Sequence, residues 1–184
     1  MKKAYIFPGI GYHCDKPLLY YTKKLLKDYE IIEIQFKNLD FDIQVSEEKA
    51  FQQAKEQMKE VDSSTLFVSK SIGTYCAARL AKEYKIQKNI YFTPLEDTMP
   101  YIKKEDLIFS GSKDQWANYD VLKKYTNSHG LFLHTVKDGN HSLETGNIIE
   151  DIENMKKIMI KVKQFIEERE CVADITLIYI RFEK

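Results

Sequence analysis

The chain has 184 residues, 43% of them hydrophobic, so it can bury one sizeable core but is too short for two ordinary catalytic domains. Lysine and arginine together number 28, as do aspartate and glutamate, so the formal net charge is zero. Because there is no global basic field and no stretch close to the ~18 apolar residues of a membrane span, we expect neither nucleic acid nor a membrane as a partner.

Short apolar runs alternate with longer stretches of helical periodicity, a pattern typical of a parallel sheet with helices on both faces. We expect strands over residues 4–7, 31–36, 65–68, 89–93, 107–110 and 131–136. Most of these runs are apolar at successive positions, as in strands that are covered on both sides. The sequence therefore predicts an α/β fold, a three-layer sandwich around a mainly parallel sheet of about six strands.

Helical patterns occupy the segments between these strands. The first covers residues 17–29, with Asp15 as a candidate N-cap and Pro17 in the first turn. Ser46 is a candidate cap for a second helix that would extend past Met58 to Val61. A third helix starts directly after Ser71, and a fourth covers about 115–125. The last covers 148–168 and is expected to bury a stripe of Ile152, Met155, Met159, Val162 and Ile166.

The C-terminal residues 171–184 differ in character from the single domain expected over residues 1–170. The run from Asp174 to Phe182 is strongly β-prone and lies beyond the helix that would complete the domain. It could add an edge strand, pair with a second copy of the chain in a homodimer, or form a poorly ordered tail. An exposed run of this kind would be prone to aggregation.

The cysteines and the N-terminus bear on the compartment. Cys14, Cys76 and Cys171 form neither a CxxC pair nor an even-numbered disulfide framework, which fits a reducing environment. The opening Met1-Lys2-Lys3 is similar to the start of a signal peptide, but only residues 4–7 form an apolar run after it. We therefore expect a soluble, cytoplasmic protein.

A strand, a tight turn centred on Ser71 and a helix are predicted in succession over residues 66–78. A nucleophilic serine requires this context, because it sits on a strained turn between a strand and a helix that approach closely. Small residues stand two before and two after it, at Ser69 and Gly73, so the usual G-x-S-x-G is here S-x-S-x-G. The helix N-terminus would favour a developing oxyanion. The alternative is that Ser71 only caps the helix.

Two further polar residues follow predicted strands, where ligand sites gather in parallel sheets. Asp114 comes after the strand at 107–110, and His141 follows the next one. The resulting order Ser, Asp, His is that of α/β hydrolases and differs from the chymotrypsin and subtilisin orders. Glu96 and Asp97, after the strand at 89–93, compete with Asp114 for the role of the acid, and Asp114 is favoured because of its fuller Gly-Ser-Lys-Asp loop.

The other histidines are better explained by packing or solvation. His134 lies within a predicted strand, and His129 lies in a polar turn. His13 and Cys14 could line the pocket, although a packing role is favoured. Sequential residues such as His13, Cys14 and Asp15 rarely all point at one ion, so we expect no metal.

The sequence resembles the α/β-hydrolase superfamily, and within it the small serine hydrolases without an inserted cap, which include esterase-like and dienelactone-hydrolase-like relatives. These share a K-S-[IM]-G elbow and a G-[ST]-x-D-x-x-A acid loop. The resemblance runs from about residue 5 to 165, and its first strand would be the family's third, which implies a reduced form of the fold. It is carried by Pro8-Gly9-Ile10-Gly11 and by residues 69–74, 111–117 and 139–142.

This resemblance implies a catalytic triad of Ser71, Asp114 and His141, with the backbone N–H groups of Ile10 and Ile72 as the oxyanion hole. Pro8-Gly9 replaces the His-Gly often found in the family's oxyanion loop. We expect an acyl-transfer mechanism without metal or organic cofactor, acting on a small ester or thioester in an open, shallow site. The expected pocket lining is Gly9, Gly11, Tyr12 and Trp116.

The alternative is a non-catalytic binding or interaction protein of the same fold. In such a protein, Ser71 would be buried or unpaired with His141.

Overall fold

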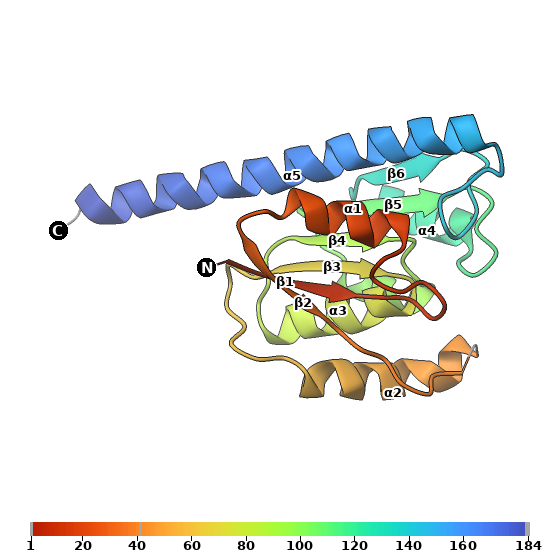
Figure 1. The fold of residues 1–184 in the computed structure, drawn as a ribbon, viewed down its shortest axis with the longest axis horizontal. Helices are drawn as coiled ribbons and strands as arrows, with labels where there is room; N and C mark the ends of the chain where they lie inside the picture. The colour runs from red at the N-terminus through yellow and green to blue at the C-terminus, as the bar shows by residue number, and fades with distance from the viewer. Residues whose placement is uncertain (1, 41, 183–184) are drawn as a thin grey trace.

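A single sheet of six parallel strands forms the centre of the computed structural model (Figure 1). The structure describes the backbone of residues 2–40 and 42–182. It describes the side chains of these residues up to position 168, except at positions 43 and 44. The strand order is β2-β1-β3-β4-β5-β6. All neighbouring pairs are parallel. The strands are β1 (Lys2–Phe7), β2 (Tyr29–Glu33), β3 (Leu66–Lys70), β4 (Asn89–Phe92), β5 (Leu107–Gly111) and β6 (Leu133–Val136). The predicted parallel α/β sheet is confirmed, with strand ends that differ by up to three residues.

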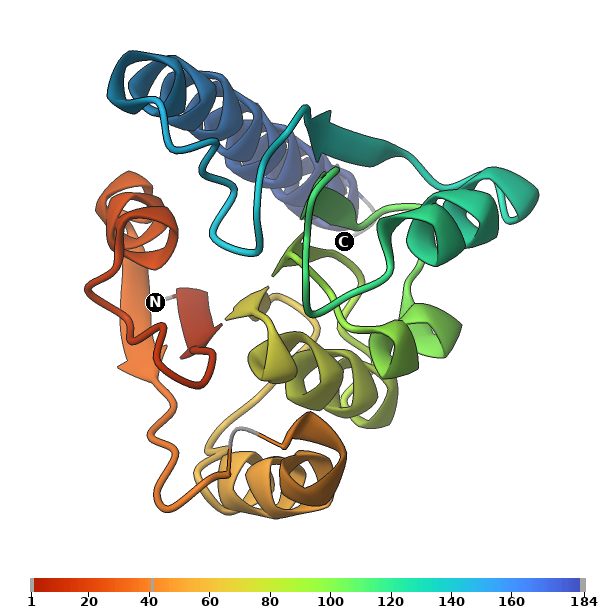
Figure 2. The same cartoon turned by 90° about the vertical axis from the view of Figure 1, so that its right-hand side faces the viewer.

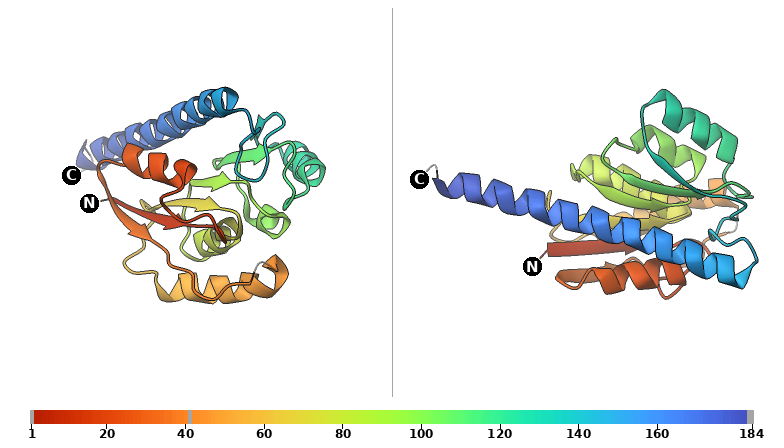
Figure 3. Two further views of the ribbon diagram at one scale, coloured as in Figure 1. Left: turned by 45° about the vertical axis from the view of Figure 1, so that its right-hand side comes forward. Right: turned by 90° about the horizontal axis from the view of Figure 1, so that it is seen from above.

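Helices cover both faces of the sheet, giving three layers (Figures 2 and 3). Helix α1 (Pro17–Leu25) and the long α5 (Ile148–Phe182) lie on one face, and α2 (Ile43–Glu56) and α3 (Ile72–Glu83) lie on the other. Successive residues of β3 alternate between these two layers: Leu66 and Val68 pack on the α1/α5 side, and Phe67 on the α2/α3 side. Lys70 is the next alternate residue after Leu66 and Val68, so it also lies on the α1/α5 side of the sheet.

Two helices differ from the predicted bounds at their ends. Helix α1 begins at Pro17 as expected, but it ends at Leu25, and no side chain caps it. The N-cap of α2 is Asp42, whose carboxylate accepts from the Val45 N–H, rather than Ser46. The Ser46 hydroxyl instead donates to the Asp40 carbonyl and is buried inside the first turn.

Helix α2 ends at Glu56, before Met58 and Val61, although both of these side chains still pack against the core. The helical spacing therefore identified the buried side chains correctly, but not the point where the helix ends. The reason is that an apolar residue can reach the same core from the segment that follows a helix.

The fourth helix starts later than its pattern suggested. Helix α4 covers Tyr119–Ser128 rather than 115–125, and Asn118 caps it by accepting from the N–H groups of Asp120 and Val121. In the preceding segment, the N–H groups of Trp116 and Ala117 donate to the Asp114 carboxylate. The short 3₁₀ helix η1 (Glu96–Tyr101) packs beside α4.

Helix α5 buries Ile158, Val162 and Ile166 against the sheet, whereas Ile152, expected in the buried stripe, is 61% exposed. The buried stripe of α5 therefore lies nearer the middle of the helix than the sequence pattern predicted. The backbone of residues 171–182 continues this helix, so the expected β-prone segment is not a strand over this range. Extending an existing helix requires no new nucleation, which can outweigh local β propensity. Positions 183 and 184 lie outside the described residues.

Within the described part of the chain, no helix combines the length and apolar character needed to cross a bilayer.

All six strands point their carboxyl ends toward the same edge of the sheet, because the sheet is wholly parallel. The turn after β3 and the loops that follow β1, β5 and β6 therefore meet at that edge. This edge carries the residues that the sequence singled out.

Candidate active site

Ser71 occupies a strained turn between β3 and α3. Its backbone has φ 56° and ψ −128°, a region that non-glycine residues rarely adopt. Hydrogen bonds from the Ser71 N–H to the Phe92 carbonyl (3.1 Å) and from the Thr74 N–H to the Ser71 carbonyl (2.8 Å) fix the turn. The turn places Ser71 at the N-terminus of α3, where the residue is buried, with 8% of its surface exposed, as the non-catalytic alternative allowed; unlike in that alternative, its hydroxyl is also paired with His141.

The small residues around Ser71 are needed for close packing. A Cβ at Gly73 would lie 2.5 Å from the carbonyl oxygens of Phe7 and Pro8, so only glycine allows α3 to approach the end of β1 this closely. At the position of the missing first glycine, Ser69 is fully buried, and its hydroxyl donates to the Ile90 carbonyl at 3.2 Å. A serine is therefore accommodated where the usual motif has glycine.

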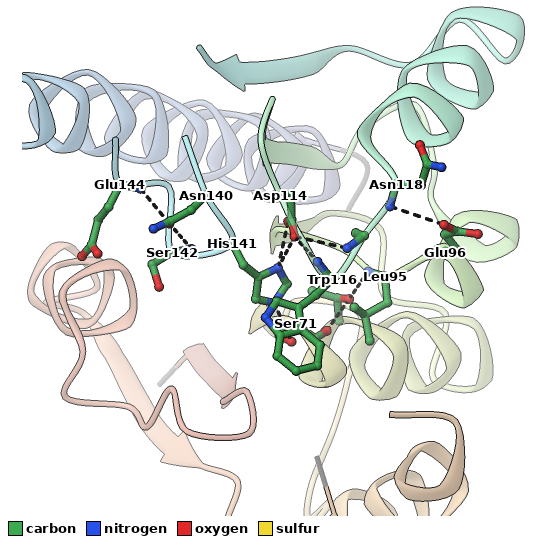
Figure 4. Close-up of polar contacts among 12 residues, drawn as sticks. Ser71, Leu95, Glu96, Asp114, Trp116, Asn118, Asn140, His141, Ser142 and Glu144 are labelled. Atoms are coloured by element: carbon green, nitrogen blue, oxygen red, sulfur yellow. Dashed lines mark hydrogen bonds and ion pairs between the residues drawn. The ribbon is translucent and has the colours of Figure 1, made fainter. Parts of the chain in front are cut away.

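A chain of hydrogen bonds joins three of the predicted residues (Figure 4). The Nε2 of His141 lies 2.8 Å from the Oγ of Ser71. On the other side of the ring, Nδ1 lies 2.8 Å from Oδ2 and 2.9 Å from Oδ1 of Asp114. Ser71, His141 and Asp114 come from loops after three different strands, and the fold brings all three together.

Asp114 is held as an anion in spite of its burial. Its side chain has no exposed surface, and burial by itself would raise the pKa of the carboxyl. The hydrogen bonds from His141 and from the N–H groups of Trp116 (2.8 Å) and Ala117 (3.1 Å) outweigh burial, so the pKa lies below the ordinary aspartate value. Asp114 therefore stays charged and can orient the imidazole.

Burial lowers the pKa of His141 below that of a free imidazole, since only 18% of its side chain is exposed. The hydrogen bond to Asp114 acts in the opposite direction, and the charge of Lys70 again lowers the pKa. The imidazole is therefore neutral at physiological pH, as a proton acceptor must be.

The loop that carries His141 is fixed by its neighbour Asn140. The side-chain oxygen of Asn140 accepts from the backbone N–H groups of Ser142 (2.7 Å) and Glu144 (3.2 Å) (Figure 4). The backbone N–H of Asn140 donates to the Glu144 carbonyl at 2.9 Å. This compact turn leaves the imidazole little freedom to move relative to Ser71.

A cavity of about 180 Å³ opens beside Ser71 and His141. Three of the expected lining residues, Gly11, Tyr12 and Trp116, border it, and Trp116 remains 54% exposed. Gly9 instead borders a neighbouring groove, although its Cβ position lies only 3.0 Å from the Ser71 Cβ. The complete lining is Ile10, Gly11, Tyr12, Lys70, Ser71, Trp116, His141 and Ser142.

Sequence reasoning missed Lys70 and Ser142 as lining residues. The signal for Lys70 was a lysine at the end of an apolar strand, since lysine is rarely buried without a partner. Ser142 carried no signal beyond its position next to His141.

Of the two residues expected to supply oxyanion N–H groups, Ile10 borders the cavity and Ile72 directly follows Ser71. Ile72 is the first residue of α3, so its N–H lies at the positive end of the helix dipole. Ile10 follows Gly9, whose backbone N–H and carbonyl both hydrogen-bond to the backbone of Tyr12. Ile10 and Ile72 remain the predicted oxyanion donors.

The competing residues lie apart from this hydrogen-bonded chain. Asp97 is in η1 and interacts with Glu47 of α2. Burial and the nearby Asp97 carboxylate raise the pKa of Glu47 to about 7. His134 contacts the ring of Phe109 in a tilted arrangement and the ring of Phe132 edge-to-face. His129 contacts Tyr125.

His13 borders the neighbouring groove, as does Cys14, rather than the cavity at Ser71. Among the residues with a described structure, no cluster of histidine, cysteine and carboxylate side chains has the arrangement of a metal site.

No protein-family model matches the chain, and no curated protein matches its sequence. Solved structures do match. A proposed hydrolase of the α/β superfamily from Xanthomonas campestris has a TM-score of 0.68 and 11% identity, over 91% of this chain and 99% of that one. A proposed YdeN-like hydrolase from Pectobacterium atrosepticum has a TM-score of 0.65 and 12% identity, over 92% of both chains.

An α/β serine hydrolase without a lid, also from X. campestris, has a TM-score of 0.62 and 12% identity, over 90% of this chain and 81% of that one. The chain therefore has the α/β-hydrolase fold, as the sequence resemblance implied.

Proposed function

We propose that the chain is a serine hydrolase that cleaves a small ester or thioester through an acyl-enzyme. The observation that supports this most directly is the hydrogen-bonded chain from Ser71 through His141 to Asp114, with distances of 2.8 Å on both sides of the imidazole. The fold is one in which this arrangement performs acyl transfer.

In the proposed mechanism, the Nε2 of His141 takes the proton of Ser71 as the hydroxyl oxygen attacks the carbonyl carbon of the substrate. The N–H groups of Ile72 and Ile10 stabilise the negative charge on the carbonyl oxygen. The imidazolium then protonates the departing alcohol or thiol, and an acyl-Ser71 ester remains. A water molecule, deprotonated by His141, releases the acid and restores the hydroxyl.

A purely structural role for Ser71 explains these features less well. A serine that only capped α3 would bond to the N–H groups of the first turn, but Ser71 makes no such side-chain bond. Its strained backbone and its hydrogen bond to a partly buried histidine both favour a nucleophile.

The first experiment is labelling of the purified protein with a fluorescent fluorophosphonate, which reacts covalently with activated serines. We expect the wild type to be labelled, and both Ser71→Ala and His141→Ala to lose labelling. Ser142→Ala serves as the matched control, because Ser142 borders the same cavity without a partner base. His129→Ala, on an exposed residue away from the site, is the control for loss of a histidine.

Labelling that survives in Ser71→Ala would contradict the proposal, as would a folded wild type that does not react. Because the label blocks the nucleophile, hydrolysis of short-chain ethyl esters and thioesters is then measured with unlabelled wild type, which determines which acyl compounds it accepts.

A further inference from the structure

Lys70, the residue before the nucleophile, is fully buried at the end of β3 and borders the cavity beside Ser71. Lysine is almost never buried without a partner, because removing an ammonium group from water is costly. A lysine in this position therefore requires an explanation that packing alone does not supply.

The amine of Lys70 is unpartnered. Among the described residues, none makes a hydrogen bond with its Nζ. The nearest aromatic ring is that of Tyr12, whose centroid lies 5.1 Å from Nζ. An aromatic ring face attracts a cation but provides no counter-charge, so the charged amine would still lack an anion.

The acidic group that interacts electrostatically with Lys70 is Asp114, whose carboxylate already accepts hydrogen bonds from other groups. The carboxylate of Asp114 accepts from both the His141 ring and the N–H groups of Trp116 and Ala117. The cavity is thus bordered by a residue whose buried amine has no free anion to pair with among the residues that line the cavity.

We infer that the acyl group of the substrate carries a carboxylate that pairs with Lys70 while Ser71 attacks the ester carbonyl. This deepens the proposed hydrolase function and rests on it. Lys70 and Ser71 are adjacent in the chain and border the same cavity. The cavity of about 180 Å³ favours a short chain. The substrate class is the monoester of a short dicarboxylic acid.

The protonation of Lys70 supports this assignment. Burial lowers the pKa of the amine to about 7, and the charge of Asp114 raises it only in part. A bound carboxylate would favour the charged form and so draw a proton onto Nζ.

The other groups that face Lys70 do not replace that anion. Tyr12 has its pKa raised to about 12 by burial and stays neutral, and His141 is neutral or positive. Binding of the carboxylate should therefore weaken as the pH rises above about 7.

The test compares matched pairs of ethyl esters that differ only in charge: monoethyl succinate with ethyl succinamate, and monoethyl glutarate with ethyl glutaramate. In each pair an amide replaces the carboxylate at nearly constant shape. At pH 6.5 we expect the wild type to prefer at least one carboxylate ester by about tenfold or more in kcat/KM. We expect the preference to disappear in Lys70→Met and to persist in Lys123→Met, whose exposed lysine lies over the ring of Tyr119 outside the cavity.

The wild type alone provides a second readout, which does not depend on the folding of a variant. The ratio of the two kcat/KM values should fall between pH 6.5 and pH 9 as Lys70 loses its proton. Both esters use the same His141, so its titration cancels in the ratio.

A ratio near one in the wild type, or a preference that persists in Lys70→Met, would overturn the inference while leaving the proposed hydrolase intact. If no ester is hydrolysed and no fluorophosphonate label is incorporated, the proposed function fails. In that case calorimetric titration of Ser71→Ala with monoethyl glutarate and ethyl glutaramate still decides the role of Lys70. Equal binding of the two compounds would overturn it, and tighter binding of the anion would support it.

Discussion

Gly111 at the end of β5 lies directly against Gly139 in the loop after β6, so closely that a Cβ at Gly111 would be 2.1 Å from the Gly139 carbonyl oxygen. The N–H of Lys113 also donates to that carbonyl at 2.9 Å. The loop that carries Asp114 and the loop that carries His141 are thus held together by backbone contact. The distance between acid and base depends on this contact.

Gly111→Ala should therefore impair both folding and reactivity. Inserting a methyl group into a tightly packed position typically costs 1–3 kcal/mol, and here the neighbouring atom is backbone that cannot rotate away. We expect a lower midpoint of thermal unfolding and slower fluorophosphonate labelling in the fraction that remains folded. The control is Gly130→Ala, where nothing lies within 4 Å and only the positive φ of 63° is unfavourable. An unchanged labelling rate in folded Gly111→Ala would show that the loop contact does not position the site.

Asp114→Asn should reduce kcat by about 10⁴-fold with little effect on stability, because an amide can no longer hold the imidazole in the required tautomer or stabilise its charged form. The matched control is Asp97→Asn, since Asp97 follows the neighbouring strand and competed with Asp114 in the sequence. Ester hydrolysis should be close to wild type in this control. The opposite pattern, with activity lost in Asp97→Asn, would identify Asp97 as the acid.

The pH dependence of kcat/KM on an uncharged ester should show an acid limb set by His141. Only the neutral imidazole can accept a proton, so activity falls as the pH drops through the pKa of His141. Burial lowers that pKa below the ordinary value of about 6.5, and the charge of Lys70 lowers it further. In Lys70→Met we expect the acid limb to move to higher pH. A limb that stays in place would mean that Lys70 does not act on His141 electrostatically.

Lys70 should also make the stability of the protein depend on pH. The unfolded chain keeps the Lys70 proton up to about pH 10.4, whereas burial lowers the folded pKa to about 7. Between these values the unfolded state binds more protons, so the contribution of Lys70 to the free energy of unfolding increases with pH. Its slope is at most about 1.4 kcal/mol per pH unit.

Lys70→Met should remove this slope and be more stable than the wild type at neutral pH, because it no longer buries an ionisable amine. Chemical denaturation of both proteins from pH 7 to pH 10 measures the difference, and Lys123→Met again serves as the control. Parallel stability curves for the wild type and Lys70→Met would contradict the assigned burial.

The local sequence around Ser71 was sufficient to predict the strand, turn and helix at the centre of the site. A buried apolar run, a serine between small residues and a helical pattern each favour the same local structure, so no distant contact had to be known. Asp114 and His141 could be placed in loops at the same edge because each follows a predicted parallel strand.

Other features depended on atoms that are distant in the sequence. The start of α4 at Tyr119 could not be read from periodicity, because Asp114 and Asn118 both accept from N–H groups two and three residues later, and only Asn118 begins a regular helix. Likewise, the β-prone run after residue 170 continues α5 because a helix already precedes it.

The sequence by itself predicted a mainly parallel sheet of about six strands and the three polar residues, since both follow from hydrophobic pattern and from position after strands. Only the tertiary structure decided that Ser71, His141 and Asp114 lie within hydrogen-bonding distance, and that Lys70 borders the same cavity with no hydrogen-bond partner for its amine among the described residues. Hydrophobic pattern specifies which face of a strand is buried, but whether a buried charge has a counter-ion depends on loops that meet only when the sheet is complete.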